Sequence, residues 1–334
     1  MKIKFWGVRG SIPAPFHAAD ITWKLEQILA LALDVPLADP RRVADFIAGL
    51  PSHLLHPVGG STPCVEVTLG ADRVILDAGS GIRRLGLDMC PEQFFPENDL
   101  DLINFKENLI NPCPPAERNI TILLSHTHWD HIQGFPFFAP AYGVGNRISL
   151  YGHDGGQLAE AFGSQQKAPQ MFPISLSDMG ADLSFHSFPE AGLTVGGLTV
   201  AALPLPHPGG GLAFRVSGGG RSVVYATDYE FTDDNSRETA RFVDFMAGAD
   251  VVISDTQYTY LESVAREGWG HSTSFGALEL AMRAEAGYFF LFHHDPEHSD
   301  AKLLDNLEKT RAYQVMSSGS LRVELASEGL SLEL

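Results

Sequence analysis

The chain has 334 residues, and its 41 acidic residues against 23 basic ones give a formal net charge of −18. A charge of this sign disfavours a broad surface for nucleic acid or anionic membrane, because such surfaces are basic. The length is enough for a large core in one domain or two.

The N-terminal sequence MKIKFWGVRGS lacks the apolar core of a signal peptide. No apolar run approaches the ~20 residues of a membrane-spanning helix. The three cysteines, Cys64, Cys90 and Cys113, lie far apart and form no CxxC pair. The odd count and the absent signal favour a reducing cytosol over a disulfide scaffold, so we expect a cytoplasmic protein without a membrane segment.

Short apolar runs rich in branched side chains recur along the chain, and they predict strands. In chain order they are Lys2–Val8, Cys64–Leu69, Arg73–Leu76, Ile120–Leu124, Arg147–Tyr151, Leu198–Leu203, Leu212–Val216, Arg221–Ala226, Val251–Ser254, Tyr288–Phe292 and Leu321–Ala326. Three glycines separate LAFRVS from RSVVYA, which predicts a hairpin there.

Helical patterns lie between the strands. Residues 235–250 form one, and residues 272–287 form another, with Ser272, Thr273 or Ser274 as the cap and Gly287 as the end. Because helices and strands interleave, we expect α/β layers.

Two stretches read as insertions into this pattern. The first, at about 16–57, contains helix-like runs at 19–33 and 39–50, and the second, at about 89–118, is rich in Pro and Asn. Long excursions of this kind are surface decoration, a lid or an oligomer contact. We expect one domain over residues 1–334 that carries both insertions.

The sequence LLSHTHWDHIQG, Leu123–Gly134, places three histidines and one aspartate within six residues. His126 and His128 are two apart, so in an extended segment their side chains point the same way, and Asp130 and His131 would reach a second position after the turn. One histidine is usually a satisfied core residue, but four such side chains at one strand end favour zinc, manganese or iron over calcium.

HTHWDH resembles the HxHxDH signature of the metallo-β-lactamase fold. The resemblance extends to FWGVRGSIPAP, GGSTPCVEV, ILDAGSGIRRLG, LPHPGGG, VVYATDYE, ISDTQYT, GWGHST and LFHHDPEH, which occur in the family's usual order. Together these segments span nearly the whole chain outside the insertions, and the HST and FHHDP elements point to the branch of ribonuclease Z and the cyclic-phosphate phosphodiesterases. The resemblance implies an αββα four-layer sandwich.

The same resemblance implies two divalent metal ions per chain, zinc first, with manganese or iron as alternatives. The implied ligands are His126, His128 and His207 for the first ion, Asp130, His131 and His293 for the second, and Asp228 as the bridge between them. Each lies at or just beyond a predicted strand end, where α/β proteins place their sites. His294 competes for the last position, and we prefer His293 because it directly follows the strand.

Three further motifs stand near these residues. Asp77 either orients a ligand histidine or caps the helix that follows it. The loop Gly59–Thr62 is expected to offer backbone donors to phosphate, and the helix that starts near Ser272 is expected to direct its N-terminus at the anion. Trp129 and Trp269 flank the motifs and are expected to pack rather than to stack on a ligand.

The expected reaction is the hydrolysis of a small cyclic or nucleotide-like phosphodiester by a hydroxide that bridges the two ions. His271 in GWGHST would be the general acid for the leaving alkoxide, and Asp255 would hold its tautomer. The expected catalytic residues are therefore His271, Asp255 and Asp130, the last of which is also a ligand.

Three other functions remain open. A ribonuclease Z-type nuclease is opposed by the acidic charge, so structured RNA is not the expected partner. A carboxylic ester, thioester or lactone hydrolase on the same scaffold is opposed by His271 and Asp255, and a binding protein with a vestigial site by the complete ligand set.

Ribonuclease Z-like relatives are commonly dimers, so we expect a homodimer. The first insertion, with Trp23, Leu25 and Leu29, would cover the active-site mouth or the subunit contact.

Overall fold

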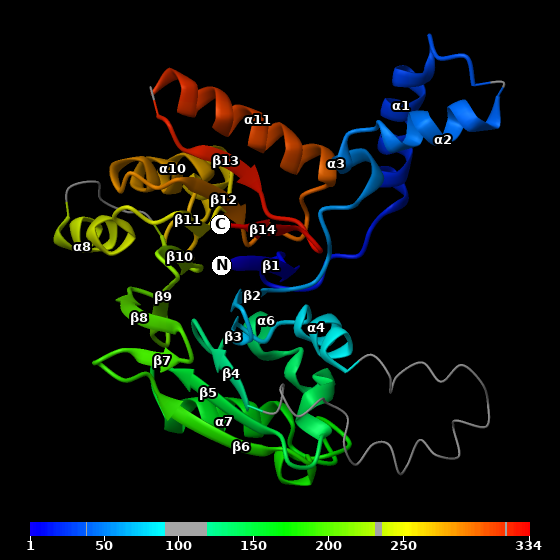
Figure 1. Cartoon of the computed structure of the whole chain (residues 1–334). Coiled ribbons are helices and arrows are strands. Elements are labelled where there is room, and N and C mark those ends of the chain that lie inside the picture. Colours follow the sequence, from blue (N-terminus) through cyan, green and yellow to red (C-terminus); the bar gives the residue numbers. More distant parts are fainter. Residues whose placement is uncertain (38, 91–118, 231–235, 318) are drawn as a thin grey trace, which may run out of the picture.

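The computed structural model describes residues 1–37, 39–90, 119–230, 236–317 and 319–334. Within these ranges the chain forms two seven-stranded sheets that pack face to face (Figure 1). The first sheet has the order β14-β1-β2-β3-β4-β5-β6. Its strands are β1 (Lys2–Gly7), β2 (Cys64–Leu69), β3 (Asp72–Leu76), β4 (Asn119–Leu123), β5 (Arg147–Gly152), β6 (Asp182–Ser187) and β14 (Ser331–Glu333).

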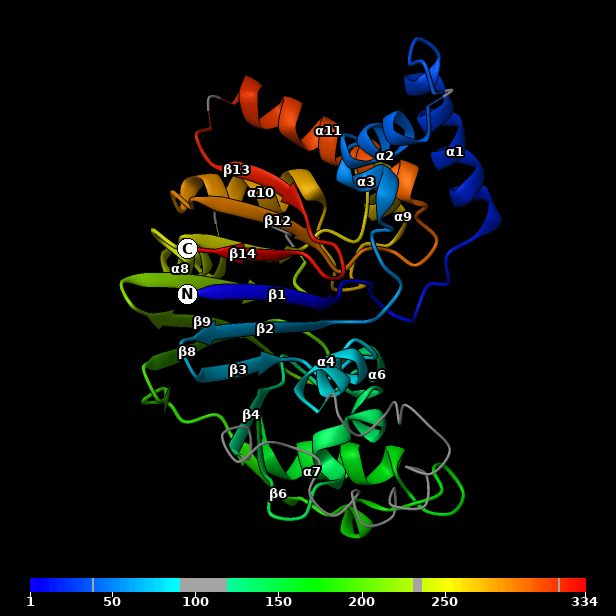
Figure 2. The same cartoon turned by 45° about the vertical axis from the view of Figure 1, so that its right-hand side comes forward.

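The second sheet has the order β13-β12-β11-β10-β9-β8-β7. Its strands are β7 (Leu193–Val195), β8 (Leu198–Leu205), β9 (Gly211–Gly218), β10 (Arg221–Ala226), β11 (Val251–Asp255), β12 (Tyr288–Phe292) and β13 (Arg322–Leu325). Strands β10 to β13 are parallel, as are β3 to β6 in the first sheet. Within each sheet, these parallel strands therefore bring their carboxyl ends to one side (Figure 2).

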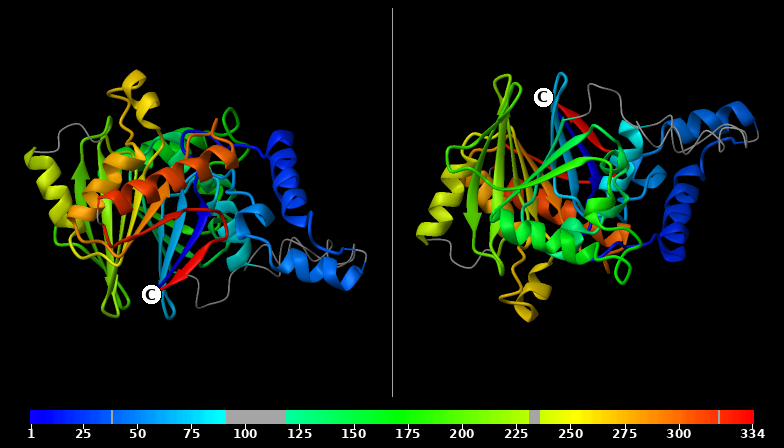
Figure 3. Two further views of the ribbon diagram at one scale, coloured as in Figure 1. Left: turned by 90° about the horizontal axis from the view of Figure 1, so that it is seen from above. Right: turned by 90° about the horizontal axis from the view of Figure 1, so that it is seen from below.

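Helices cover the outer face of each sheet (Figure 3). The α-helices of the described residues are α1 (Ala18–Ala32), α2 (Pro40–Ala48), α3 (Ser52–Leu55), α4 (Ile82–Met89), α6 (Trp129–Ile132), α7 (Gly155–Gln165), α8 (Arg237–Met246), α9 (Tyr260–Ala265), α10 (Ser274–Arg283) and α11 (Asp300–Met316). Residues of α4 and α7 share a core with the first sheet, and residues of α8, α10 and α11 share one with the second. The αββα four-layer arrangement expected from the resemblance is confirmed.

The two-residue period of a strand divides the core between layers. In β12, Phe290 and Phe292 point into the core between the sheets, whereas Phe289 and Leu291 face the helices. Successive side chains of a strand point to opposite faces, so a strand buried on both faces is apolar without interruption. This is why YFFLF could be identified as a strand from the sequence.

The hairpin between β9 and β10 confirms the expected glycine turn. Gly218 pairs with Arg221, which leaves Gly219 and Gly220 as a two-residue loop. Their φ angles are 59° and 74°. Two consecutive positive φ angles define a turn that matches the twist of the strands, and glycine adopts them without a steric cost.

The first insertion folds as α1, α2 and α3, close to the helices expected at 19–33 and 39–50. Lys24 of α1 forms a buried ion pair with Asp300 at the start of α11, with 2.9 Å between Nζ and Oδ2. The helices α1 and α2 project from the rest of the molecule (Figure 1). The second expected insertion, 89–118, lies outside the described residues apart from positions 89 and 90.

Two expectations about the chain as a whole can be compared with the structure. Among the described residues, the helices are too short or too polar to traverse a bilayer. Cys64 is a buried free thiol, but Cys90 is disulfide-bonded. The cysteines were expected to favour a reducing cytosol over a disulfide scaffold; the disulfide at Cys90 does not support that expectation, and the compartment stays a prediction.

Candidate metal centre

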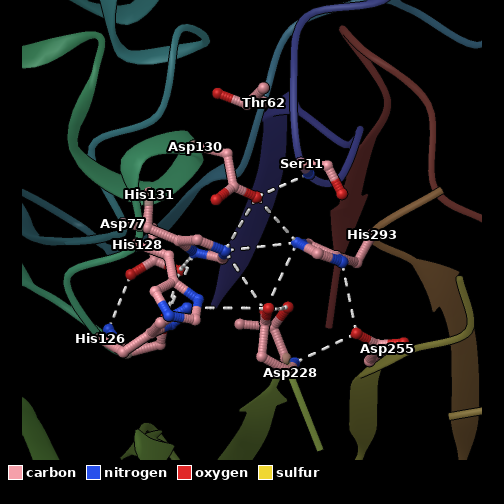
Figure 4. A network of polar contacts seen from close by, with 12 residues as sticks. Ser11, Thr62, Asp77, His126, His128, Asp130, His131, Asp228, Asp255 and His293 are labelled. Atoms are coloured by element: carbon pink, nitrogen blue, oxygen red, sulfur yellow. Dashed lines mark hydrogen bonds and ion pairs between the residues drawn. The ribbon is translucent and has the colours of Figure 1, made fainter. Parts of the chain in front are cut away.

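The residues expected as ligands gather where the strands of both sheets end (Figure 4). His126, His128, Asp130 and His131 follow β4, and His207, Asp228 and His293 follow β8, β10 and β12. Asp228 and His293 have positive φ angles of 54° and 59°. Asp and His are among the few residues enriched in this left-handed region, where the chain turns sharply out of a strand.

One group of side chains could hold a first ion. Ligand atoms of His126, His128, His207 and Asp228 all lie within 4.8 Å of one another. The distance between His128 Nδ1 and His207 Nε2 is 3.1 Å, and that between His126 Nε2 and Asp228 Oδ1 is 3.7 Å. His126 Nε2 is buried without a hydrogen-bond partner. A buried polar atom without a partner is costly, and a cation would satisfy it.

A second group lies beside the first. His131 Nε2 is 3.2 Å from Asp130 Oδ2 and 3.2 Å from Asp228 Oδ2. His293 Nε2 is 3.2 Å from Asp130 Oδ2, 3.4 Å from Asp228 Oδ2 and 3.2 Å from His131 Nε2. Four ligands placed tetrahedrally at ~2.0–2.1 Å from one zinc ion would be ~3.3–3.4 Å from each other. Ligand atoms of Asp130, His131 and His293 have this spacing, so these three residues could share one ion, with Asp228 Oδ2 next to both histidines.

Asp228 belongs to both groups. Its Oδ1 faces His126 and its Oδ2 faces His131 and His293. The carboxylate can therefore offer one oxygen to each position, as the expected bridging role requires.

Asp77 contacts a candidate ligand. Its Oδ2 accepts a hydrogen bond from His131 Nδ1 at 2.8 Å, and its carboxylate also accepts from Ser125 and from the Tyr225 hydroxyl. The helix that follows has Gly81 at its N-cap, so the alternative of a capping role for Asp77 was wrong. A carboxylate that holds the second nitrogen of a ligand histidine fixes the ring orientation and its tautomer.

Two further residues support the second group, and the sequence did not identify them. The Ser11 amide donates to Asp130 Oδ2 at 2.7 Å. The Gln257 amide oxygen lies 3.0 Å from His293 Nδ1, and its Nε2 donates to Ser11 Oγ at 3.1 Å. Both residues lie in motifs quoted for the resemblance, FWGVRGSIPAP and ISDTQYT, but neither is a metal-ligand type.

His293 rather than His294 faces the cluster. His294 is fully buried and turned the other way, with Nε2 at 2.9 Å from the Ala326 carbonyl oxygen. Gly10 passes so close to His293 that an added Cβ would lie 2.5 Å from its ring. The preference for His293 agrees with this geometry.

His271 and Asp255 form a pair next to Asp228. Asp255 Oδ2 lies 2.7 Å from His271 Nδ1, and Asp255 is fully buried. His271 Nδ1 is 3.8 Å from Asp228 Oδ1, and 12% of the His271 side chain is exposed. Burial lowers the pKa of His271, but the adjacent Asp255 carboxylate outweighs it, so the pKa lies above its ordinary value. This shift favours the protonated ring, in which Asp255 holds Nδ1 and Nε2 carries the other proton.

The charges of the cluster fit cations. Burial lowers the pKa of His207 to about 4 and that of His126 well below its ordinary value, so both rings are neutral and can donate lone pairs near pH 7. Burial alone would also lower the pKa of His293, but Asp228, Asp130 and Asp255 raise it to about 10. The carboxylates of Asp130, Asp228 and Asp255 therefore favour a positive charge at this place, and the histidines and carboxylates present suit a divalent ion such as zinc.

Two other expectations were wrong, and one was met only in part. The Ser61 and Thr62 amides already donate to Glu328 and to Ser80 Oγ, so these two amides of the Gly59–Thr62 loop are not free for a phosphate. The helix α10 has Thr273 as its N-cap, one of the three expected caps, but it ends at Arg283, before the expected Gly287. Trp129 and Trp269 do not pack in the interior, since they are 63% and 62% exposed.

Comparison with known proteins agrees with this geometry. Residues 73–294 match the family model of the β-lactamase superfamily domain. The probable metallo-hydrolase YhfI of Bacillus subtilis (strain 168) is 28% identical over 207 residues, which are 58% of this chain and 76% of that protein. Ribonuclease Z of Picrophilus torridus is 36% identical over 92 residues, or 27% of each chain.

Solved structures share the fold at low sequence identity. The crystal structure of YhfI has a TM-score of 0.60 and 21% identity, and it covers 100% of this chain and 99% of its own. A diphosphatase from the PhnP family has a TM-score of 0.55 and 16% identity, with 100% and 97% covered. Both cover the described strands and helices from end to end.

Proposed function

Since the chain belongs to the metallo-β-lactamase superfamily and is a metal-dependent hydrolase, we propose that it hydrolyses a small cyclic or nucleotide-like phosphodiester with two divalent ions. The observation that carries the proposal is the position of Asp228, with one oxygen toward each ligand group and His271 beside it. Residues His126, His128 and His207 would hold one ion, and Asp130, His131 and His293 the other.

Charge balance supports two ions rather than one. Asp77, Asp130, Asp228 and Asp255 are all buried, and they carry four negative charges when ionised. Two divalent cations would neutralise them. Buried carboxylates are stable when they are paired or bind metals, so one ion would leave part of this charge uncompensated.

When bound, such a pair of ions lowers the pKa of water from ~16 toward ~7 and offsets charge on phosphoryl oxygens. The chain's own residues provide the remaining steps. Asp255 accepts from His271 Nδ1, so His271 Nε2 is the atom that would give a proton to the departing alkoxide. The Ser11 amide and Asp77 keep Asp130 and His131 in place throughout.

The His271–Asp255 pair also ranks the alternatives. An alkoxide leaving group needs a proton more than a thiolate does, so a buried acid favours phosphodiester over thioester substrates. The net charge of −18 opposes binding of structured RNA, although ribonuclease Z is among the relatives.

Two measurements on protein purified without chelator test the proposal. Elemental analysis should approach two equivalents of metal per chain, and a single equivalent at full activity would contradict the dinuclear site. Turnover should then be compared on a cyclic phosphodiester, a thioester and a precursor tRNA. Faster turnover of the thioester or of the tRNA would replace the proposed substrate class.

A further inference from the structure

A large aromatic side chain stands in solvent beside the candidate centre. Trp269 is 62% exposed, and it is two residues before His271. Single exposed apolar residues are common, but this tryptophan stands two residues from the proposed general acid, so its exposed ring is a candidate contact for a ligand near His271.

The backbone around Trp269 is fixed to the centre. Gly268 and Gly270 donate to the two oxygens of Glu230 at 2.7 and 2.9 Å. Gly270 packs on His207 so closely that an added Cβ would lie 2.8 Å from its Nδ1. Gly270 has a φ of 87°, which favours glycine. Trp269 is thus held between two anchored residues, one of which touches a candidate ligand.

The ring of Trp269 has a cation near it. The Arg266 guanidinium carbon lies 5.9 Å from the Trp269 ring and 4.8 Å from the Tyr258 ring, and the Arg266 carbonyl accepts from the Trp269 amide at 3.1 Å. Arg266 is also 3.6 Å from Asp295. Tyr258 in turn packs edge-on against His271, with 5.4 Å between ring centroids. These contacts link the Trp269 loop to the proposed general acid.

Trp129 provides a contrast. It is 63% exposed and follows His128, so it also borders the centre. It stands at the first position of the four-residue α6, whose Asp130 and His131 are candidate ligands. The two tryptophans have the same chemistry and nearly the same exposure, but Trp269 is the one two residues from His271, the proposed general acid.

We propose that the substrate carries a nucleobase on its leaving-group side and that the base stacks on Trp269. This inference rests on the proposed phosphodiesterase function and specifies its substrate class. Every base has a π-face, so an exposed indole binds nucleotides without reading their sequence. Because the chain has a net charge of −18, a stacking contact would add affinity for a phosphate-bearing ligand without depending on charge.

The test compares a 2′,3′-cyclic nucleotide with the same cyclic ribose phosphate lacking the base, in metal-loaded protein. Wild type should prefer the nucleotide through a lower KM. Trp269→Leu should raise KM for the nucleotide about 5- to 150-fold, the factor for one lost stack, and leave KM for the base-free ester unchanged. Trp269→Tyr, which keeps an aromatic plane, should retain much of the preference. Calorimetric binding of a nucleoside monophosphate should weaken in the same order without any turnover.

Trp129→Leu is the matched control, and it should affect both substrates equally. Equal effects of Trp269→Leu on both substrates, full retention of the preference by that variant, or a selective effect of Trp129→Leu would overturn the assignment. A base-free ester turned over as well as the nucleotide would overturn the nucleobase while the phosphodiesterase function stands. Failure to cleave either ester would overturn the function itself.

Discussion

Three strand-end residues at the centre have backbone conformations that most side chains avoid. Asp77, Asp228 and His293 each follow a strand and have φ angles of 62°, 54° and 59°. Such conformations cost ~1–3 kcal/mol each and persist where the surrounding structure determines them. Here the sharp turn lets a carboxylate or ring point back across the strand ends, so the strain coincides with the residues that contact one another in the cluster.

His271 provides the sharpest test at this scale. His271→Ala should leave the metal content intact and lower turnover by ~10²–10⁴-fold, because general acid–base catalysis contributes about that factor. The loss should be much smaller for a nitrophenyl ester, whose leaving group needs little protonation. Steady-state rates on an alkyl and a nitrophenyl phosphodiester measure both effects.

Asp255→Asn should give a milder version of the same pattern, since it removes the partner of His271 Nδ1 but leaves the ring. Because Asp255 Oδ2 is also 3.3 Å from His293 Nδ1, metal content must be measured for this variant. An equal rate loss of His271→Ala on both esters would remove His271 from the general-acid role.

The sequence identifies functional residues whose type and spacing alone indicate a metal site. His126, His128, Asp130 and His131 stand in one loop, so their type and spacing are enough to predict a metal site. Ser11 and Gln257 are ordinary polar residues, and their roles depend on contacts with residues 119 and 36 positions away. Trp269 was placed wrongly, because exposure depends on whether neighbouring segments cover a ring and no local pattern records that.

At the scale of single elements, the β9–β10 hairpin contains a glycine whose only constraint is its backbone conformation. Gly220 has a φ of 74°, and an added Cβ would have no neighbour within 4 Å. Gly220→Ala should therefore lower the free energy of unfolding by ~1 kcal/mol through backbone strain alone. Gly220→Asn should cost less, since Asn tolerates this region. Denaturant unfolding curves measure both.

Gly163 is the matched control, because it lies in the helix α7, is exposed and also has open space around a Cβ. Gly163→Ala should raise the free energy of unfolding by ~0.5–1 kcal/mol, since alanine suits a helix interior better than glycine. The same substitution thus has opposite signs at the two positions. A loss of stability at both would mean that bulk rather than φ decides the effect.

The sequence predicts elements best when one physical signal dominates them. The buried strands are uninterrupted apolar runs, and the helices at 19–33 and 39–50 were placed within one or two residues. The helix α11 was not predicted, because its buried positions Asp300, Asn306 and Thr310 are polar and interrupt the apolar stripe. The strands β6, β7 and β14 are short or partly exposed, so their side chains carry little of the alternating pattern.

At the scale of the molecule, the first insertion exposes a row of apolar side chains. Ile21, Leu25 and Leu29 of α1 and Leu33 at its C-cap are spaced four residues apart, and each is about half exposed or more. Its buried anchor, Lys24 with Asp300, ties it to α11. We propose that this row forms the homodimer contact, because an apolar stripe of this length is stabilised when a second copy covers it.

Leu25→Glu with Leu29→Glu should convert the dimer to a monomer without loss of the fold, since both side chains are exposed. Sedimentation equilibrium across a concentration series measures this. Val315→Glu with Met316→Glu, at exposed positions near the end of α11, is the control and should leave the dimer intact. A wild-type monomer, or a dimer that survives the α1 substitutions, would contradict the contact.

The candidate ligand residues come from both sheets, and the chain crosses between the sheets at β6 and β7 before β14 returns to β1. A fragment that ends in that crossover would carry the four candidate ligands after β4, and the remainder would carry His207, Asp228 and His293. Neither half would hold the whole proposed ligand set. A cation bound here would contact residues of both halves, so its binding free energy would add to the free energy with which the two sheets associate. If the chain were divided into two fragments at this crossover, tight cation binding would appear only when the fragments associate.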